Sequence, residues 1–180
     1  MSSEADTSRV WTIVVAAGSS ARFGADKLDV ALDGDRTVLD LSLLHAAAAS
    51  TGIVVVVRND SPLLHARPSD NVSVVAGGSN RSASVRAGLQ MVPASVPYVL
   101  VHDAARPLAD ADLYRRVIGA LRAGAEAVVP VVPVVDTIRS VTEGVIDRDL
   151  LRAVQTPQGF RTDVLRRAHA DADDATDDAT

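Results

Sequence analysis

VWTIVVAAG, residues 10–18, is a β-branched run that stops at three small residues. A run of this kind is typical of a fully buried strand in a parallel sheet. We therefore expect a strand at residues 10–15, followed by a loop that lasts to about Asp35.

The same rhythm of apolar runs and helical segments continues along the chain. Strands are predicted at residues 53–57, 71–75, 98–101 and 127–132, with helices at residues 37–52, 80–92 and 110–124. Thr37 and Asp40 have the spacing of a capping box, and Gly52 is the expected stop of that first helix. Asp110 is expected to cap the third helix, which should end near Gly124.

Alternating strands and helices predict an α/β fold with a mostly parallel sheet and helices on both faces. A chain of 180 residues with 47% hydrophobic content is long enough for one core and too short for two ordinary ones, so residues 1–180 are expected to form a single domain. Ligands of such folds bind at the carboxyl ends of the strands.

Two segments depart from this rhythm. Residues 137–149 contain two short segments around Glu143-Gly144 and predict a protruding β-hairpin arm. A hairpin alone is marginally stable, so another subunit is its expected support. Residues 171–180 form an acidic tail of Asp, Ala and Thr, which suits either a solvated helix start or a disordered tail.

Composition restricts the partners and the compartment. The net charge of −5 is carried by the five aspartates of the tail, and the rest of the chain is balanced, so we expect no nucleic-acid partner. The chain has no cysteine, no recognisable export signal and no apolar run of the roughly 20 residues that a membrane span needs. A cytoplasmic protein without a membrane partner is expected.

The loop that follows the first strand, residues 16–27, has the chemistry of an anion site. Ala16, Ala17 and Gly18 allow backbone N–H groups to approach an anion, and Arg22 and Lys27 add two cations. Fixed positive charge is what phosphoryl-type transfer requires from a protein. The loop has neither the Walker spacing nor that of a dinucleotide-binding loop, and by itself an ordinary glycine turn explains it equally well.

Two later loops also precede helices. Gly77-Gly78-Ser79-Asn80 has free N–H groups suited to a base edge or an anion, although ordinary helix capping explains it as well. His102-Asp103-Ala104-Ala105-Arg106-Pro107 is more specific, because it sets an acid and a base directly after a buried strand. Asp103 is a candidate ligand for Mg²⁺ and Arg106 a candidate phosphate contact, with a local ion pair as the alternative and a structural role expected for His102.

Taken together, these loops resemble the 2-C-methyl-D-erythritol 4-phosphate cytidylyltransferase family. The matching motifs, in the family's order, are Ala16-Ala17-Gly18 with Arg22 and Lys27, Gly77-Gly78 with Arg81 and Ser84-Val85, Val101 to Pro107, Asp136-Thr137-Ile138, Gln155-Thr156-Pro157-Gln158, and Thr176-Asp177-Asp178-Ala179. The opening loop is shared by many nucleotidyltransferases, whereas the stretch around Asp103 joined to Thr-Pro-Gln is close to diagnostic.

The resemblance implies a Rossmann-like nucleotidyltransferase fold and transfer of CMP from CTP to methylerythritol phosphate, with release of pyrophosphate, in the non-mevalonate isoprenoid pathway. It gives catalytic roles to Arg22 and Lys27 at the α-phosphate, and the metal, Mg²⁺ or another divalent cation, to Asp103. The implied nucleotide-binding residues are Ala16, Ala17, Gly18, Arg22, Lys27, Gly78, Ser79, Ser84, Asp103 and Ala104. The implied contacts to the sugar-alcohol phosphate are Asp103, Arg106, Thr137, Arg148 and Thr156. In similar enzymes the hairpin crosses to a partner, so the resemblance also implies a homodimer in which Arg148 and Thr156 complete the neighbour's site.

The sequence departs from the family's pattern at three points. Val15 and Asp26 stand where the family usually has Pro, which makes the first loop partly similar to molybdopterin nucleotidyltransferases. No counterpart of the family's later Asn-x-Lys segment follows the tail, so the sequence either is a piece of a longer protein or acts without that Lys. A cytidylyltransferase for ribitol 5-phosphate, a molybdopterin guanylyltransferase and a catalytically silent nucleotide-binding domain are the alternatives.

Overall fold

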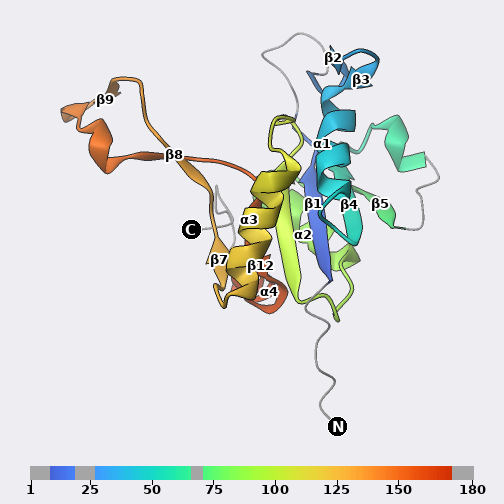
Figure 1. The fold of residues 1–180 in the computed structure, drawn as a ribbon. Coiled ribbons are helices and arrows are strands. Elements are labelled where there is room, and N and C mark those ends of the chain that lie inside the picture. Colours follow the sequence, from blue (N-terminus) through green and yellow to red (C-terminus); the bar gives the residue numbers. More distant parts are fainter. Residues whose placement is uncertain (1–8, 19–26, 66–70, 172–180) are drawn as a thin grey trace.

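A computed structural model describes residues 9–18, 27–65 and 71–171 of the chain. Its centre is a six-stranded sheet in the order β5-β4-β1-β6-β12-β7 (Figure 1). The strands of this sheet are β1 (Val10–Val15), β4 (Gly52–Val57), β5 (Val72–Ala76), β6 (Tyr98–Asp103), β7 (Ala127–Val128) and β12 (Gln158–Arg161). The helices are α1 (Val38–Ala47), α2 (Arg81–Met91), α3 (Ala111–Arg122) and α4 (Thr162–Asp171).

The first four strands of the sheet confirm the predicted parallel arrangement. β1 pairs in parallel with β4 on one side and β6 on the other, and β4 pairs in parallel with β5. Their carboxyl ends therefore meet at one edge of the sheet, where residues that follow Val15, Val57, Ala76 and Asp103 come together. This edge is where a ligand site is expected in an open α/β sheet.

The prediction of one continuous strand at residues 127–132 was wrong. It is split into β7 and β8 (Val131–Pro133) around Pro130, because proline has no N–H to donate to a ladder. β7 stays in the main sheet, whereas β8 leaves it and pairs antiparallel with β11 (Arg152–Val154). The unpredicted strand β12 lies between β6 and β7 and is antiparallel to both.

Helices cover both faces of the sheet, as predicted. One core cluster contains Val14 and Val55 of the sheet and Tyr114, Val117 and Ile118 of α3, with α1 packed beside them. The other contains Val56 with Val85 of α2 and Leu165 of α4. Because every residue of β4 is buried, the valines of β4 serve both cores, which explains the continuous apolar run of that strand.

The capping box of α1 is present. Thr37 accepts a hydrogen bond from Asp40 N, and the Asp40 carboxylate accepts one from Thr37 N. The helix ends earlier than predicted, at Ala47, and Gly52 is instead the first residue of β4. Before α1, the chain forms a short hairpin from β2 (Ala31–Asp33) and β3 (Arg36–Thr37), where only a loop was expected.

The hairpin expected around Glu143-Gly144 is formed by β9 (Ile138–Ser140) and β10 (Gly144–Ile146), which pair antiparallel. Gly144 has φ +88°, a left-handed conformation that favours glycine at this turn. Figure 1 shows the hairpin at the end of a long excursion away from the main sheet, joined to it through β8 and β11. Short 3₁₀ turns occur at Lys27–Asp29, Pro62–His65 and Arg148–Leu150.

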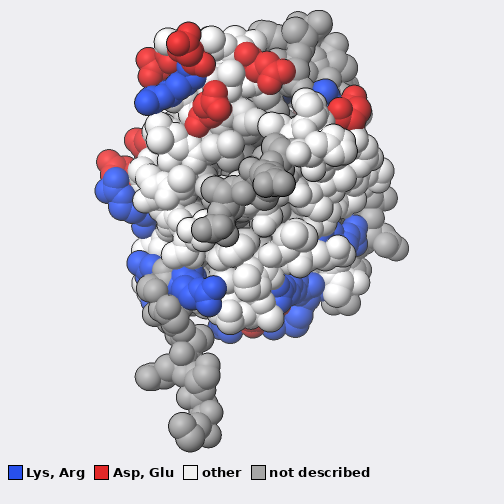
Figure 2. Space-filling model, turned by 90° about the vertical axis from the view of Figure 1, so that its right-hand side faces the viewer, with Lys and Arg blue, Asp and Glu red and all other residues white. Residues whose placement is uncertain are grey.

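The surface agrees with a balanced charge on the face seen in Figure 2. Most of the Lys and Arg on this face lie toward the lower end, whereas Asp and Glu lie mainly toward the upper end and the left edge, with some Lys or Arg among them. This face thus has no continuous basic stripe among the described residues. None of the helices in the described ranges is both long and apolar enough to cross a membrane. The acidic tail beyond Asp171 lies outside the described residues.

Candidate active site

A cavity of about 490 Å³ opens at the carboxyl ends of β1, β5 and β6. Three loops that are far apart in the sequence line it. The first contributes Val15, Ala16, Ala17, Gly18, Lys27 and Leu28, the second Gly78, Ser79, Asn80, Arg81 and Ser84, and the third Asp103, Ala105 and Arg106. The parallel topology therefore brings together the three polar loops that the sequence singled out. Arg22 lies outside the described residues.

Hydrogen bonds tie the start of each loop to the sheet. Ala16 N donates to Val56 O at 2.7 Å, Gly77 N to Val57 O at 2.7 Å, and Ala104 N to Val15 O at 3.0 Å. The loops thus leave the sheet from fixed points, and the backbone at the bottom of the cavity is held by neighbouring strands.

The second loop is folded tightly on its own helix. Ser84 Oγ accepts from Gly78 N at 3.1 Å and donates to Asn80 O at 2.9 Å, while Asn80 Oδ1 caps α2 by accepting from Ala83 N at 2.7 Å. A Cβ added to Gly78 would lie 2.4 Å from Ala83 Cβ, so this position has no room for a side chain. Ser84 is buried and holds the loop in shape, whereas Ser79 is exposed at the cavity.

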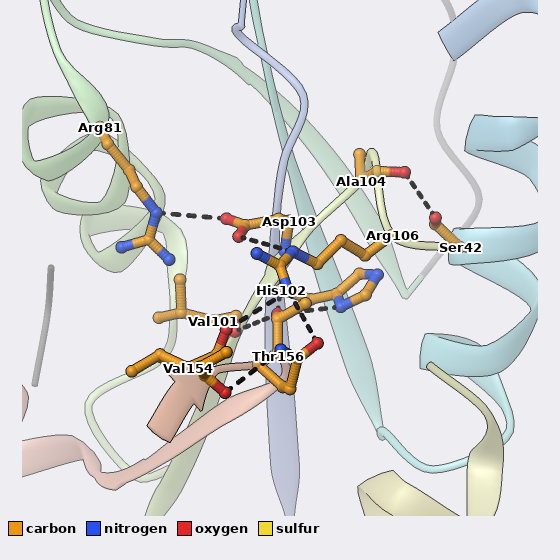
Figure 3. A network of polar contacts seen from close by, with 11 residues as sticks. Ser42, Arg81, Val101, His102, Asp103, Ala104, Arg106, Val154 and Thr156 are labelled. Atoms are coloured by element: carbon orange, nitrogen blue, oxygen red, sulfur yellow. Dashed lines mark hydrogen bonds and ion pairs between the residues drawn. The ribbon is translucent and has the colours of Figure 1, made fainter. Parts of the chain in front are cut away.

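Asp103 lies between two arginines that come from opposite sides (Figure 3). Arg81 Nε donates to Asp103 Oδ1 at 3.2 Å, and Arg106 Nε lies 3.9 Å from Oδ2. The Asp103 side chain is 34% exposed, so it remains open to the cavity. No role was predicted for Arg81, although it was part of the recognised motif. Its sequence signal, an Arg directly after the loop at the start of a helix, does not specify the partner across the cavity.

The residues present fit a divalent cation that arrives with a polyphosphate. Asp103 is the carboxylate that the described residues contribute to the cavity wall, and no group of three His, Cys, Asp or Glu side chains suited to a metal occurs in the described ranges. Mg²⁺ is commonly bound by one or two carboxylates together with substrate phosphates. Asp103 with a bound triphosphate would provide that combination, whereas a cage made of protein ligands alone is absent from the described part.

Arg106 links this cavity to a second one of about 740 Å³. The second cavity is lined mainly by apolar residues of the loop at residues 105–109 and by single apolar side chains of β2, α1, α3 and β8, together with Asp33, Arg106, Gln155 and Thr156. Arg106 Nη1 donates to Gln155 Oε1 at 2.8 Å. Thr156 is 3% exposed, and its hydroxyl is bonded to the backbone of β6 in the same chain. The expectation that Thr156 completes the site of a neighbouring subunit was therefore wrong.

Other predicted site residues are not brought to Asp103 within one chain. Thr137 is exposed, and Arg148 Nη1 donates to Val135 O at 2.6 Å; both lie in the hairpin segment and line neither cavity. Ala104 is fully buried, with its carbonyl accepting from Ser42 Oγ at 2.7 Å. Ala105 lines the cavity in its place.

His102 is buried behind the site, as its expected structural role requires. Its ring lies 5.6 Å from that of Tyr114, centroid to centroid. Burial lowers the pKa of His102 to about 4, and burial raises the pKa of Tyr114. Both rings are therefore neutral near pH 7.

A mainly parallel α/β sheet with a polar cavity at its carboxyl edge is the arrangement in which open α/β proteins bind ligands. The three loops that build this cavity are those of a nucleotidyltransferase family. The family model described as 2-C-methyl-D-erythritol 4-phosphate cytidylyltransferase matches residues 10–180. The chain belongs to this family.

Individual relatives carry the family's name, and a solved structure of that name has a similar fold. The chain is 46% identical to 2-C-methyl-D-erythritol 4-phosphate cytidylyltransferase of Rhodococcus opacus, over 94% of this chain and 79% of the relative. It is 46% identical to the enzyme of the same name from Nocardia farcinica, over 94% and 78%. The crystal structure of the enzyme of this name from Thermus thermophilus superposes with a TM-score of 0.77 and 35% identity, over 95% of this chain and 81% of that one.

Proposed function

We propose that this chain transfers CMP from CTP to 2-C-methyl-D-erythritol 4-phosphate, yielding 4-diphosphocytidyl-2-C-methyl-D-erythritol and pyrophosphate for isoprenoid precursor synthesis. The observation that carries the proposal is the convergence of the three family loops on one cavity that contains Lys27, Arg81 and Asp103. The names of its relatives give the alcohol. Both substrates are phosphorylated metabolites, and a chain without cysteine suits the reducing cytoplasm where they would be met.

The reaction joins a hydroxyl oxygen of the alcohol to the α-phosphorus of CTP. As that bond forms, the bond from the α-phosphorus to the bridging oxygen of the β-phosphate breaks, pyrophosphate departs, and the hydroxyl proton is lost to solvent or to the leaving phosphate. The transition state spreads negative charge over the α-phosphate oxygens and the leaving pyrophosphate. Lys27, at the cavity wall, supplies fixed positive charge there, and Arg22 is proposed to do the same.

The nucleotide would lie across the first and second loops. The backbone of Ala16, Ala17 and Gly18 suits the triphosphate, and Gly78 with Ser79 suits the edge of the cytosine. Mg²⁺ bound by Asp103 would neutralise the triphosphate and hold it in line for attack. Asp103 itself is oriented by Arg81 and Arg106, so it enters the cavity in a fixed direction.

The alcohol phosphate is proposed to bind at the Arg106 side of Asp103, with Thr137 and Arg148 supplied by the hairpin of a partner subunit. Support comes from the apolar side chains exposed along the excursion that carries the hairpin, where Val135 is 77%, Val145 65% and Leu150 81% exposed. Exposed apolar side chains concentrated in one segment indicate a contact surface. A homodimer would cover them and bring Arg148 to the neighbouring site.

A pyrophosphate-release assay tests the proposed function. CTP with methylerythritol phosphate and Mg²⁺ should release pyrophosphate, and ATP, GTP and UTP should react far more slowly. Faster turnover of ribitol 5-phosphate would make the chain a cytidylyltransferase for another polyol. Binding of CTP without turnover would make it a silent nucleotide-binding protein, and preference for GTP with molybdopterin would favour the guanylyltransferase alternative.

A further inference from the structure

Thr156 lies beside the carboxyl end of β6, two residues before β12 begins, and lines the second cavity (Figure 3). Its hydroxyl oxygen is 3.0 Å from Asp103 N, 3.2 Å from Val101 O and 3.1 Å from His102 Nδ1. The Thr156 side chain is 3% exposed and His102 is fully buried. One buried hydroxyl therefore joins three consecutive residues of β6.

The directions of these three hydrogen bonds follow from what each group can do. A threonine hydroxyl donates one hydrogen bond and accepts two. Asp103 N–H only donates and the Val101 carbonyl only accepts, so Thr156 accepts from the first and donates to the second. His102 must then donate to Thr156, which places the ring proton on Nδ1.

This arrangement is consistent with the surroundings of the other ring nitrogen. His102 Nε2 is buried and has no hydrogen-bond partner among the described residues. In the Nδ1–H tautomer, Nε2 is an unpaired acceptor, which proteins tolerate more readily than an unpaired N–H. The Thr156 hydroxyl then has both acceptor positions and its proton in use, and no capacity is left for a substrate phosphate.

We propose that Thr156 and His102 are positioning residues for Asp103, an inference that rests on the proposed role of Asp103 in binding CTP with its cation. Thr156 holds the Asp103 amide, and His102 holds the Thr156 hydroxyl in the orientation that accepts from that amide. Arg81 and Arg106 then set the carboxylate at the other end of the same residue. Thr156 acts on the reaction through Asp103 and does not bind the alcohol phosphate through its hydroxyl.

Hydrogen exchange at the Asp103 amide tests the contact without reference to turnover. T156V keeps the shape of the side chain and removes the hydroxyl, so the Asp103 amide should exchange roughly tenfold faster or more, and T156S should recover most of the protection. T162V is the matched control: Thr162 is also 3% exposed, but it is the first residue of α4, just beyond the other end of β12, and its hydroxyl has no partner among the described residues. Exchange at Asp103 should not respond to T162V.

Calorimetric titration with CTP and Mg²⁺, in the absence of the alcohol phosphate, tests the consequence. T156V and H102L should each bind CTP roughly tenfold more weakly, and the double variant should bind no more weakly than T156V, because both changes remove the same support. H102N should recover binding, since its side-chain amide can donate from near the position of Nδ1. H102L retains the hydroxyl and so tests the proposal even if T156V does not fold.

Two results would overturn the proposal. If T156V binds CTP like the wild-type chain and only raises KM for methylerythritol phosphate, then Thr156 contacts that substrate directly. If H102L lowers the unfolding midpoint but leaves CTP affinity and Asp103 exchange unchanged, then His102 is a core residue only. A wild-type chain that releases no pyrophosphate would refute the proposed function but not the exchange result.

Discussion

The proposed role of Lys27 is catalytic, so its removal should affect activity much more than folding stability. It lines the cavity at the end of the first loop and is partly exposed. We predict that K27A lowers kcat by about 10²–10³-fold, the usual cost of losing one charge-stabilising group in a transition state, with little change in the unfolding midpoint. Steady-state kinetics and thermal unfolding measure the two effects.

The control for K27A is R115A, which removes an exposed cation paired with Asp112 on α3, away from the cavity. R115A should change neither kcat nor the unfolding midpoint appreciably. If K27A loses activity only in proportion to its loss of folded protein, the role of Lys27 is structural.

The buried His102 side chain should make the free energy of unfolding depend on pH. Burial lowers its pKa to about 4 in the folded chain, whereas the unfolded value is about 6.5, so between these values the unfolded chain binds the extra proton. Its contribution to stability is therefore complete above about pH 6.5 and is lost as the pH falls toward 4, by about 1.4 kcal/mol per pH unit at most. Urea unfolding of wild type and H102N at pH 7, 6 and 5 should show a shallower decline for H102N. Parallel declines would contradict the assignment.

At the scale of elements, the glycines of the second loop and of α3 should respond in opposite ways. G78A introduces a Cβ that would lie 2.4 Å from Ala83 Cβ, so the loop must move and CTP affinity should fall. G119A is the matched control, because a Cβ on exposed Gly119 meets nothing within 4 Å and alanine favours the helix. We predict that G119A stabilises the chain by about 0.5–1 kcal/mol with unchanged CTP binding. Equal CTP affinity in G78A and wild type would mean that this loop does not bind the nucleotide.

The central strands were predictable because their burial leaves a local signature. The apolar runs at residues 53–57, 71–75 and 98–101 became β4, β5 and β6 within two residues at each end. β12 has only four residues, and its place depends on pairing with β6 and β7, which no local pattern encodes. α4 was also not predicted, although it is as long as α1; its Leu165 completes the core on one face of the sheet.

The site was predictable to the extent that parallel topology gathers loops at one edge. The three loops that line the cavity follow strands whose parallel arrangement the sequence predicted, so their meeting at one edge of the sheet did not require knowledge of side-chain contacts. Two sets of contacts could not be predicted without knowledge of side-chain positions, because each joins residues from different elements. They are the Arg81–Asp103 pair and the contacts among His102, Thr156 and Asp103. Thr137 and Arg148 lie outside both cavities of one chain, so their predicted roles depend on a second subunit.

At the scale of the whole molecule, the hairpin predicts a concentration-dependent assembly. V145D places a charge on β10, where Val145 is 65% exposed, and should shift the chain from dimer to monomer in analytical ultracentrifugation, with a fall in activity. L63D is the control, because Leu63 is an exposed leucine of the 3₁₀ turn beyond β4, on the other side of the main sheet from the hairpin (Figure 1). A wild-type chain that is monomeric and fully active would contradict the proposed supply of Arg148 by a partner.

The cavity at the carboxyl edge of the sheet is proposed to be the place where CMP is transferred to methylerythritol phosphate. Phosphorus NMR of the wild-type chain with CTP, methylerythritol phosphate and Mg²⁺ observes the transfer itself. We predict that the triphosphate signals disappear while those of pyrophosphate and of a new diphosphodiester appear in equal amounts. Persistence of the CTP signals would contradict this proposed transfer. So would the formation of pyrophosphate and free CMP while the alcohol phosphate stays unchanged.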